Sequence, residues 1–243
     1  MHSSSFEQRK TIISKPAIVL VHGFWGGGAH WGKVILDLTA RGYTNIHAVE
    51  NPLTSLADDA ARTQQMVKQI DGPVLLFGHS YGGAVITEAG NLPNVVGLVY
   101  IAAFAPDSGE SPGSISQAQP SVTAEDGSLS VDSDGYLGIA QDQYQTNFCQ
   151  DLNDDDSRVM AVTQKAPLAS TFGDNVTEPA GKHKPTWYQV SEDDRMINPD
   201  AERMMAQRMN PTKLIELASG HASLASLPKE VSDLIDEAAS SLS

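Results

Sequence analysis

The sequence predicts an α/β fold, with one mostly parallel central sheet and helices on both of its faces, because two kinds of segment alternate along the chain. Short apolar runs bounded by Gly, Pro or Asp have the length and composition of buried strands. Stretches with apolar residues at helical spacing separate these runs. Strands that alternate with helices form parallel sheets, which bind ligands beyond the carboxyl ends of the strands. A functional site is therefore expected at that edge of the sheet.

Five apolar runs are expected to form strands, and five amphipathic stretches to form helices. The predicted strands comprise residues 17–21, 73–77, 95–103, 186–190 and 213–217. The predicted helices comprise residues 31–40, 56–70, 83–89, 198–209 and 229–239. Because 243 residues with 40% apolar content suit one elaborated α/β domain, residues 1–243 are interpreted as a single domain.

One long segment, from about residue 106 to residue 184, breaks this alternation. It is polar, rich in Ser, Gln and Asp, and contains no clear buried strand. A stretch of this length is too long for a structureless loop in a compact domain, so we expect it to carry its own helices, with residues 154–164 the best candidate. We interpret residues 106–184 as an inserted helical cap over the strand ends. The alternative is a loose acidic surface loop.

Charge and cysteine content narrow the expected partners. The chain has 16 Lys and Arg against 30 Asp and Glu, a formal net charge of −14, and its basic residues are scattered, so no nucleic-acid partner is expected. Cys149 is the only cysteine, which excludes an intrachain disulfide and a multi-cysteine metal site.

Residues 1–10 lack the apolar core of a signal peptide, and no later run has the length of a transmembrane helix. We expect a cytoplasmic protein with no membrane partner, although an exported protein whose signal had been removed would look the same, and a homo-oligomer stays open.

A glycine-rich turn marks Ser80 as the candidate nucleophile. The run Gly78-His79-Ser80-Tyr81-Gly82-Gly83 follows one predicted strand and precedes a predicted helix. This is the Gly-x-Ser-x-Gly pattern, whose glycines are needed because side chains there would collide with neighbouring backbone in a strained turn. A phosphate-binding turn is the alternative, but a nucleotide-binding loop is disfavoured because no Lys follows the glycines.

A second glycine-rich segment, residues 22–28, follows the first predicted strand. A serine nucleophile in this kind of turn uses two backbone N–H groups as its oxyanion hole, one from the next residue and one from the loop after an early strand. Tyr81 and Phe24 are the candidates for these two donors. A dinucleotide-binding fingerprint fits poorly, because Gly26, Gly27 and Gly28 are consecutive. Neither a cofactor nor a metal ion is expected.

His221 is the candidate general base. Among the seven histidines, only His183 and His221 follow Ser80, as the order serine, acid, histidine requires. His221 lies just beyond the predicted strand at 213–217, where its side chain can face the site. His183 lies between two lysines and is expected at the surface.

The acid that orients His221 is expected just beyond the predicted strand at 186–190. Three carboxylates, those of Glu192, Asp193 and Asp194, follow that strand directly. Sequence position alone leaves all three open.

The motifs described above occur together with further short segments, and this set spans nearly the whole chain. It consists of Val21-His22-Gly23-Phe24, Gly78-His79-Ser80-Tyr81-Gly82-Gly83, Leu98-Val99-Tyr100-Ile101-Ala102-Ala103-Phe104-Ala105-Pro106, Glu192-Asp193-Asp194-Arg195 with Ile197-Asn198-Pro199, and Ser219-Gly220-His221. The combination resembles the α/β-hydrolase superfamily, in particular the small serine esterases of the salicylate and plant methyl-ester type together with the hydroxynitrile lyases. The resemblance implies an α/β-hydrolase fold with a helical cap. It also favours Asp194, the Asp directly before Arg195, as the acid.

Two positions depart from the hydroxynitrile lyases in that branch. Those enzymes have a Thr directly after the early His-Gly and a Lys directly after the catalytic His, where this chain has Phe24 and Ala222. The resemblance therefore implies cleavage of small-molecule carboxylic esters through an acyl-enzyme, rather than cyanohydrin cleavage. Trp25, His79 and Phe104 are candidate substrate-binding residues.

Other functions stay open beside ester hydrolysis. A thioesterase, lactonase, amidase or perhydrolase would use the same three catalytic residues, because fold and triad do not fix the acyl substrate. A non-catalytic receptor for small molecules would keep the pocket without turnover.

Overall fold

Six parallel strands form the centre of the computed structural model, which describes residues 15–242. In sheet order β2-β1-β3-β4-β7-β8 they are Ile46–Val49, Ala17–Val21, Val74–Ser80, Val95–Ala103, Thr186–Ser191 and Lys213–Leu217. All five predicted strands are present, and the predicted α/β fold with a parallel sheet is confirmed. Strand β2 was not predicted, because it has only four residues and most of it is half-buried at the sheet edge.

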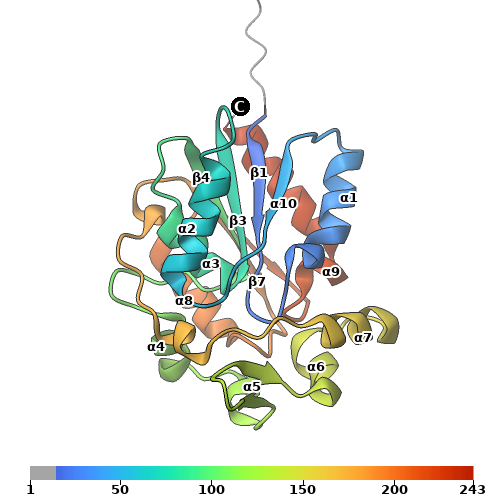
Figure 1. The fold of residues 1–243 in the computed structure, drawn as a ribbon. Helices are drawn as coiled ribbons and strands as arrows, with labels where there is room; N and C mark the ends of the chain where they lie inside the picture. Colours follow the sequence, from blue (N-terminus) through green and yellow to red (C-terminus); the bar gives the residue numbers. More distant parts are fainter. Residues whose placement is uncertain (1–14, 243) are drawn as a thin grey trace, which may run out of the picture.

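Helices cover both faces of this sheet (Figure 1). Helices α1 and α10 pack together on one face, whereas α2 and α3 pack together on the other, on the same side as α8. Their bounds are Gly32–Ala40 for α1, Leu56–Val67 for α2, Gly82–Ala89 for α3, Pro199–Met209 for α8 and Pro228–Ser241 for α10, with the short α9, Ser223–Ser226, just before α10. These bounds agree with the predicted helices to within three residues at either end.

Local sequence explains where α8 begins and ends. The Asn198 side chain accepts a hydrogen bond from the Asp200 N–H, and Pro199 occupies the first helical position, where no N–H is needed. The helix stops at Asn210, whose φ of 49° is left-handed. Helix α8 therefore starts shortly after the predicted acid turn, and its Glu202 side chain accepts the Ser191 N–H at 3.1 Å.

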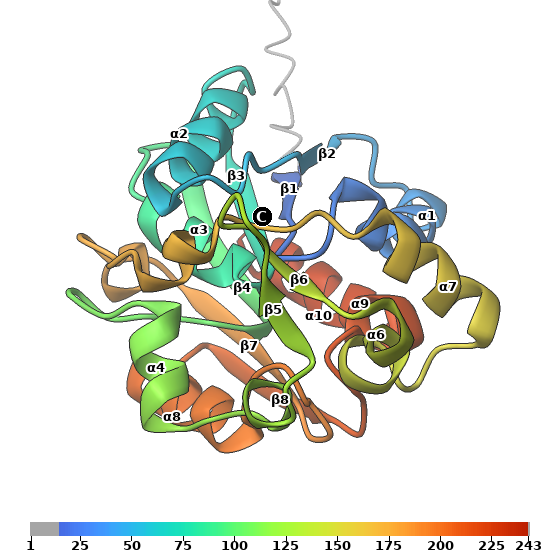
Figure 2. The same ribbon diagram turned by 60° about the horizontal axis from the view of Figure 1, so that its bottom comes forward.

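Residues 106–184 lie between β4 and β7. They form helices α4, α5, α6 and α7, two short 3-10 helices and an antiparallel pair of strands, β5 and β6. The helices are Pro112–Ala118, Val122–Glu125, Gln141–Phe148 and Asp154–Thr163, the 3-10 helices Ala169–Gly173 and Ala180–Lys182, and the strands Leu129–Val131 and Leu137–Ile139. Figure 2 shows α4 to α7 and the β5–β6 pair across the carboxyl ends of the parallel strands. We call residues 106–184 the cap segment.

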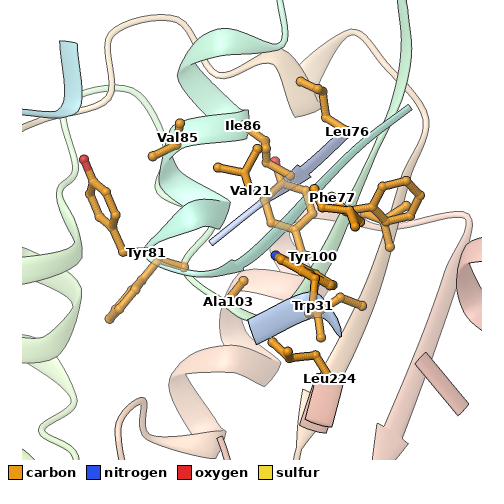
Figure 3. Close-up of a cluster of buried hydrophobic side chains, with 14 of the residues drawn as sticks. Val21, Trp31, Leu76, Phe77, Tyr81, Val85, Ile86, Tyr100, Ala103 and Leu224 are labelled. Carbon is orange, nitrogen blue, oxygen red and sulfur yellow. The ribbon is translucent and has the colours of Figure 1, made fainter. Parts of the chain in front are cut away.

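The core is built by side chains from both faces of the sheet. Figure 3 shows Leu76 and Phe77, neighbours on β3, packing among residues of β1, β4 and α3. Adjacent residues of a strand point to opposite faces, and both side chains are fully buried, so both faces are covered. This explains why β3 has a continuous apolar run rather than an alternating one.

The amino-terminal segment on which the expectation about a signal peptide rests, residues 1–10, lies outside the described residues. Within residues 15–242, no helix has both the length and the apolar character needed to cross a membrane.

Candidate active site

Ser80 ends strand β3 in a strained turn. Its φ is 57°, in the left-handed region that non-glycine residues rarely occupy. A Cβ atom on Gly78 would lie 2.5 Å from the Gly82 carbonyl oxygen, and one on Gly82 would lie 2.4 Å from the Val21 carbonyl oxygen. The turn is thus packed so tightly against β1 and α3 that glycine is required on both sides of Ser80.

His221 and Asp194 form a buried pair at the carboxyl ends of β7 and β8. Asp194 Oδ2 lies 2.6 Å from His221 Nδ1, and both side chains are fully buried. The other carboxylate oxygen of Asp194 accepts hydrogen bonds from the N–H groups of Met196, at 2.7 Å, and Ile197, at 2.9 Å. Because a carboxylate accepts from Nδ1, the imidazole carries its proton there and presents Nε2 as an acceptor.

His221 Nε2 is buried and has no hydrogen-bond partner among residues 15–242. Buried acceptors without a partner are uncommon in folded proteins. The imidazole packs against His79, the residue before Ser80, with ring centroids 4.7 Å apart, so this unpaired nitrogen belongs to the same part of the molecule as the serine turn. An acceptor of this kind is suited to take a proton.

His79 packs against His221 and does not line the cavity beside Ser80. Its Nε2 lies 2.8 Å from the His221 carbonyl oxygen, and burial lowers the pKa of the His79 imidazole well below its usual value. The neutral ring therefore donates to that carbonyl and supports the loop that carries His221. Phe148 packs edge-on against the His221 ring at 5.0 Å.

The two candidate oxyanion donors belong to residues whose rings are stacked. Phe24 and Tyr81 have ring centroids 4.0 Å apart and ring planes 15° apart. The Tyr81 hydroxyl donates to Asp59 Oδ2 at 2.7 Å, and Asp59 Oδ1 accepts the Leu53 N–H at 2.8 Å. Burial raises the pKa of Asp59 to about 6. In the described part of the chain, neither the Phe24 N–H nor the Tyr81 N–H donates to another backbone carbonyl.

A small cavity of about 60 Å³ lies beside Ser80. Two of the predicted pocket residues, Trp25 and Phe104, line it, whereas His79 does not. The cap segment and the turn after Asp194 supply further lining residues: Ser116, Ser121, Thr123, Ala124, Leu129, Leu137, Phe172, Met196 and Ile197. Most of them lie in short or irregular segments, where the sequence has no periodic signal.

No group of three or more His, Cys, Asp or Glu side chains within residues 15–242 is placed to hold a metal ion. His183, the other histidine after Ser80, is exposed, as are Glu192 and Asp193. The structure therefore pairs His221 with Asp194, packs the His221 ring against the residue before Ser80, and leaves His183, Glu192 and Asp193 at the surface.

A protein family and a plant relative both match most of this chain. Residues 18–234 match the model of a family described as Alpha/beta hydrolase family. Methylesterase 8 of Arabidopsis thaliana is 25% identical over 241 residues, which cover 91% of this chain and 88% of that protein.

Two further matches involve proteins named as hydrolases. A carbendazim hydrolyzing esterase from Nocardioides sp. (strain SG-4G) is 32% identical over 106 residues, which cover 38% of this chain and 44% of that protein. The crystal structure of a pyrethroid hydrolase from Sphingobium faniae JZ-2 matches with a TM-score of 0.78 at 21% identity, over 93% of this chain and 97% of that one. At this identity the structural match shows a common fold.

Proposed function

Since the chain belongs to the alpha/beta hydrolase family, we propose that it is a serine esterase that cleaves small carboxylic esters, with Ser80, His221 and Asp194 as its catalytic triad. One observation carries the proposal. The buried Asp194 carboxylate fixes His221 through Nδ1, which leaves an unpaired Nε2 next to the strained turn that carries Ser80. Acyl transfer uses an acid, a base and a nucleophile in these roles, so the pair next to Ser80 supports the proposal.

The names of the relatives support ester hydrolysis in particular. A methylesterase matches over most of both chains, and a carbendazim hydrolyzing esterase matches over a shorter stretch. The departures of Phe24 and Ala222 from the hydroxynitrile lyase pattern point in the same direction.

In the proposed mechanism, Ser80 Oγ attacks the acyl carbonyl while His221 Nε2 takes the hydroxyl proton. The N–H groups of Phe24 and Tyr81 donate to the oxyanion, and the alcohol leaves with the proton from His221. Water then attacks the acyl-enzyme with the same base, and Asp194 stabilises the imidazolium in both steps. The cap segment closes the cavity, which excludes bulk water from the acyl group.

The test is hydrolysis of a series of aryl esters, from acetyl to octanoyl, by the wild type, Ser80→Ala and a control. Ser121→Ala is a matched control, because Ser121 also lines the cavity but lies outside the nucleophile turn. We expect Ser80→Ala to lower kcat by about 10⁴-fold or more with the fold intact, and Ser121→Ala to retain turnover. Wild-type rates in Ser80→Ala would refute the assignment of the nucleophile.

A further inference from the structure

A second carboxyl group, that of Glu202 on α8, is fully buried against Asp194. Glutamate is almost never fully buried unless it has a partner. In the described part of the chain, no Lys, Arg or His forms an ion pair with Glu202. The proposed triad does not use this residue, so its burial needs a separate explanation.

The hydrogen bonds of the two carboxyl groups are unequal. Asp194 accepts three, from His221 Nδ1, the Met196 N–H and the Ile197 N–H. Glu202 accepts one, from the Ser191 N–H to Oε2 at 3.1 Å, while its Oε1 is buried without any donor among residues 15–242. Two ionised carboxylates in contact within a protein interior repel each other, so one of the pair holds a proton.

The proton belongs on Glu202. Asp194 has three donors that stabilise its negative charge, whereas Glu202 has one, and burial together with the charge of Asp194 raises the pKa of Glu202 well above its usual value. A proton on Oε1 converts the atom that lacks a donor into a donor itself. The nearby acceptor is the carboxylate of Asp194, because Glu202 Oε2 accepts the Ser191 N–H and the Asp194 N–H donates to the Ser191 carbonyl at 3.3 Å.

The other groups around Glu202 do not offset this arrangement. Tyr188, on β7, is a buried phenol whose hydroxyl donates to the Ala103 carbonyl, and burial raises its pKa well above the usual value, so it stays neutral. Arg203 is on α8 itself and forms its ion pairs at the surface, with Glu216 at 2.9 Å and Asp200 at 3.0 Å. Asp194 is thus the charge that determines the state of Glu202.

We propose that Glu202 is a positioning residue of the active site, a neutral carboxylic acid whose O–H group donates to Asp194 and holds that carboxylate towards His221. The catalytic part of this inference rests on the proposed function. Glu202 does not line the cavity beside Ser80, so its effect is on catalysis within the bound complex and not on substrate binding.

Three variants separate this role from a purely structural one. Glu202→Gln keeps an oxygen for the Ser191 N–H and an N–H donor for Asp194, whereas Glu202→Leu keeps neither. Asp200→Asn is the control, because Asp200 is a carboxylate at the start of the same helix whose side chain is 80% exposed.

In ester hydrolysis we expect Glu202→Gln and Asp200→Asn to keep kcat within about threefold of wild type. Glu202→Leu should lower kcat by about ten- to hundredfold with KM unchanged, because it removes a hydrogen bond to a charged group. Wild-type kcat in Glu202→Leu would overturn the proposal. An equal loss in Glu202→Gln and Glu202→Leu, with both variants folded, would also overturn it, since it would mean that an ionised carboxylate is required.

Infrared spectroscopy tests the proton without relying on activity. At about pH 8 Asp59 is ionised, since its pKa is raised only to about 6, so a carbonyl band from a protonated carboxylic acid should come from Glu202. The band should be present in the wild type and Asp200→Asn, and absent from Glu202→Gln. A wild type without the band overturns the proposal even if the enzyme cleaves esters. A wild type with the band but without esterase activity supports the proton on Glu202 and contradicts the proposed function instead.

Discussion

Three carboxylates, those of Glu192, Asp193 and Asp194, follow β7 in succession, and only Asp194 bonds to a histidine. Glu192 and Asp193 are exposed, whereas Asp194 is buried. We expect Asp194→Asn to lower kcat by about 10⁴-fold, because an amide in this position favours the wrong imidazole tautomer. Asp193→Asn is the matched control and should leave kcat unchanged in the same ester assay. Equal losses in the two variants would contradict the role of Asp194.

Residue type alone could not single out this acid. The order serine, acid, histidine limited the choice to one turn, and the family resemblance favoured Asp194 within it. The physical selection comes from the turn itself, which folds back so that the Met196 and Ile197 N–H groups meet the Asp194 carboxylate. That geometry depends on the packing of α8 against β7, which the sequence pattern does not contain.

Asp59 gives a second prediction for a single residue, this time on stability. Burial raises its pKa to about 6, whereas in an unfolded chain an aspartate has a pKa near 3.9. The folded state therefore binds this proton more tightly than the unfolded state. The contribution of Asp59 to the free energy of unfolding is therefore largest below about pH 4, and it falls as the pH rises to about 6.

An Asp59→Asn variant lacks this titration. We expect the free energy of unfolding of the wild type, minus that of Asp59→Asn, to fall by up to about 3 kcal/mol between pH 4 and pH 7. Urea unfolding at several pH values measures the difference. Asp58→Asn is the control. The corresponding difference in the free energy of unfolding should change with pH in the opposite direction, because the neighbouring Ser55 and Thr54 side chains lower the pKa of exposed Asp58. A difference for Asp59→Asn that does not change with pH would refute the buried, raised pKa.

At the scale of the elements, the turn between β3 and α3 is packed too tightly to accept an added side-chain atom at its glycines. An added Cβ at Gly82 would meet the Val21 carbonyl at 2.4 Å, and backbone cannot move aside as a flexible side chain can. We expect Gly82→Ala to lower the free energy of unfolding by about 3 kcal/mol or more.

Gly32→Ala is the matched control for that substitution. Gly32 begins α1 with a φ of −51°, and apart from its chain neighbours and the backbone of its own helix no atom lies within 4 Å of an added Cβ. Alanine should raise the free energy of unfolding there by about 0.4–1 kcal/mol, because it restricts the unfolded chain. Urea unfolding of both variants measures the contrast, and similar values for the two would contradict the tight packing at Gly82.

Burial decides which elements could be predicted. β1, β3 and β4 lie inside the sheet with both faces covered, so their sequences are continuous apolar runs. β2 is a four-residue edge strand that contains His47, and β5 and β6 have three residues each, mostly exposed or half-buried. Such short strands are defined by their partners and not by their own composition, which is why they were missed.

At the scale of the whole molecule, Trp25 connects the cap segment to the sheet. Its N–H donates to the Lys165 carbonyl at 3.0 Å, and its indole N–H donates to the Leu137 carbonyl at 2.8 Å. Its own carbonyl accepts the Tyr144 hydroxyl at 3.1 Å. One residue of the loop after β1 thus bonds to three separate parts of the cap segment. These contacts join residues more than 100 positions apart, so no local pattern could predict where the cap segment sits.

The position of the cap segment sets the size of the cavity, and therefore the acyl group that the proposed esterase accepts. About 60 Å³ is small beside the several hundred Å³ of typical ligand sites. We expect acetyl esters to be cleaved with a higher kcat/KM than octanoyl esters. The ring centroid of Phe172 lies 6.0 Å from that of Phe24 and 6.0 Å from that of Phe104. Phe172 is the largest side chain that the cap segment contributes to the lining of the cavity.

Replacing that ring should enlarge the acyl site. We expect Phe172→Ala to raise the ratio of kcat/KM for octanoyl over acetyl esters by about tenfold, because the longer chain gains apolar contacts in the space that the ring leaves. Val131→Ala is the control, since Val131 lies on the exposed side of the cap strands, and its ratio should equal that of the wild type. If the ratio for Phe172→Ala also equals that of the wild type, the acyl chain does not occupy this cavity, and substrate selection must lie elsewhere on the cap segment.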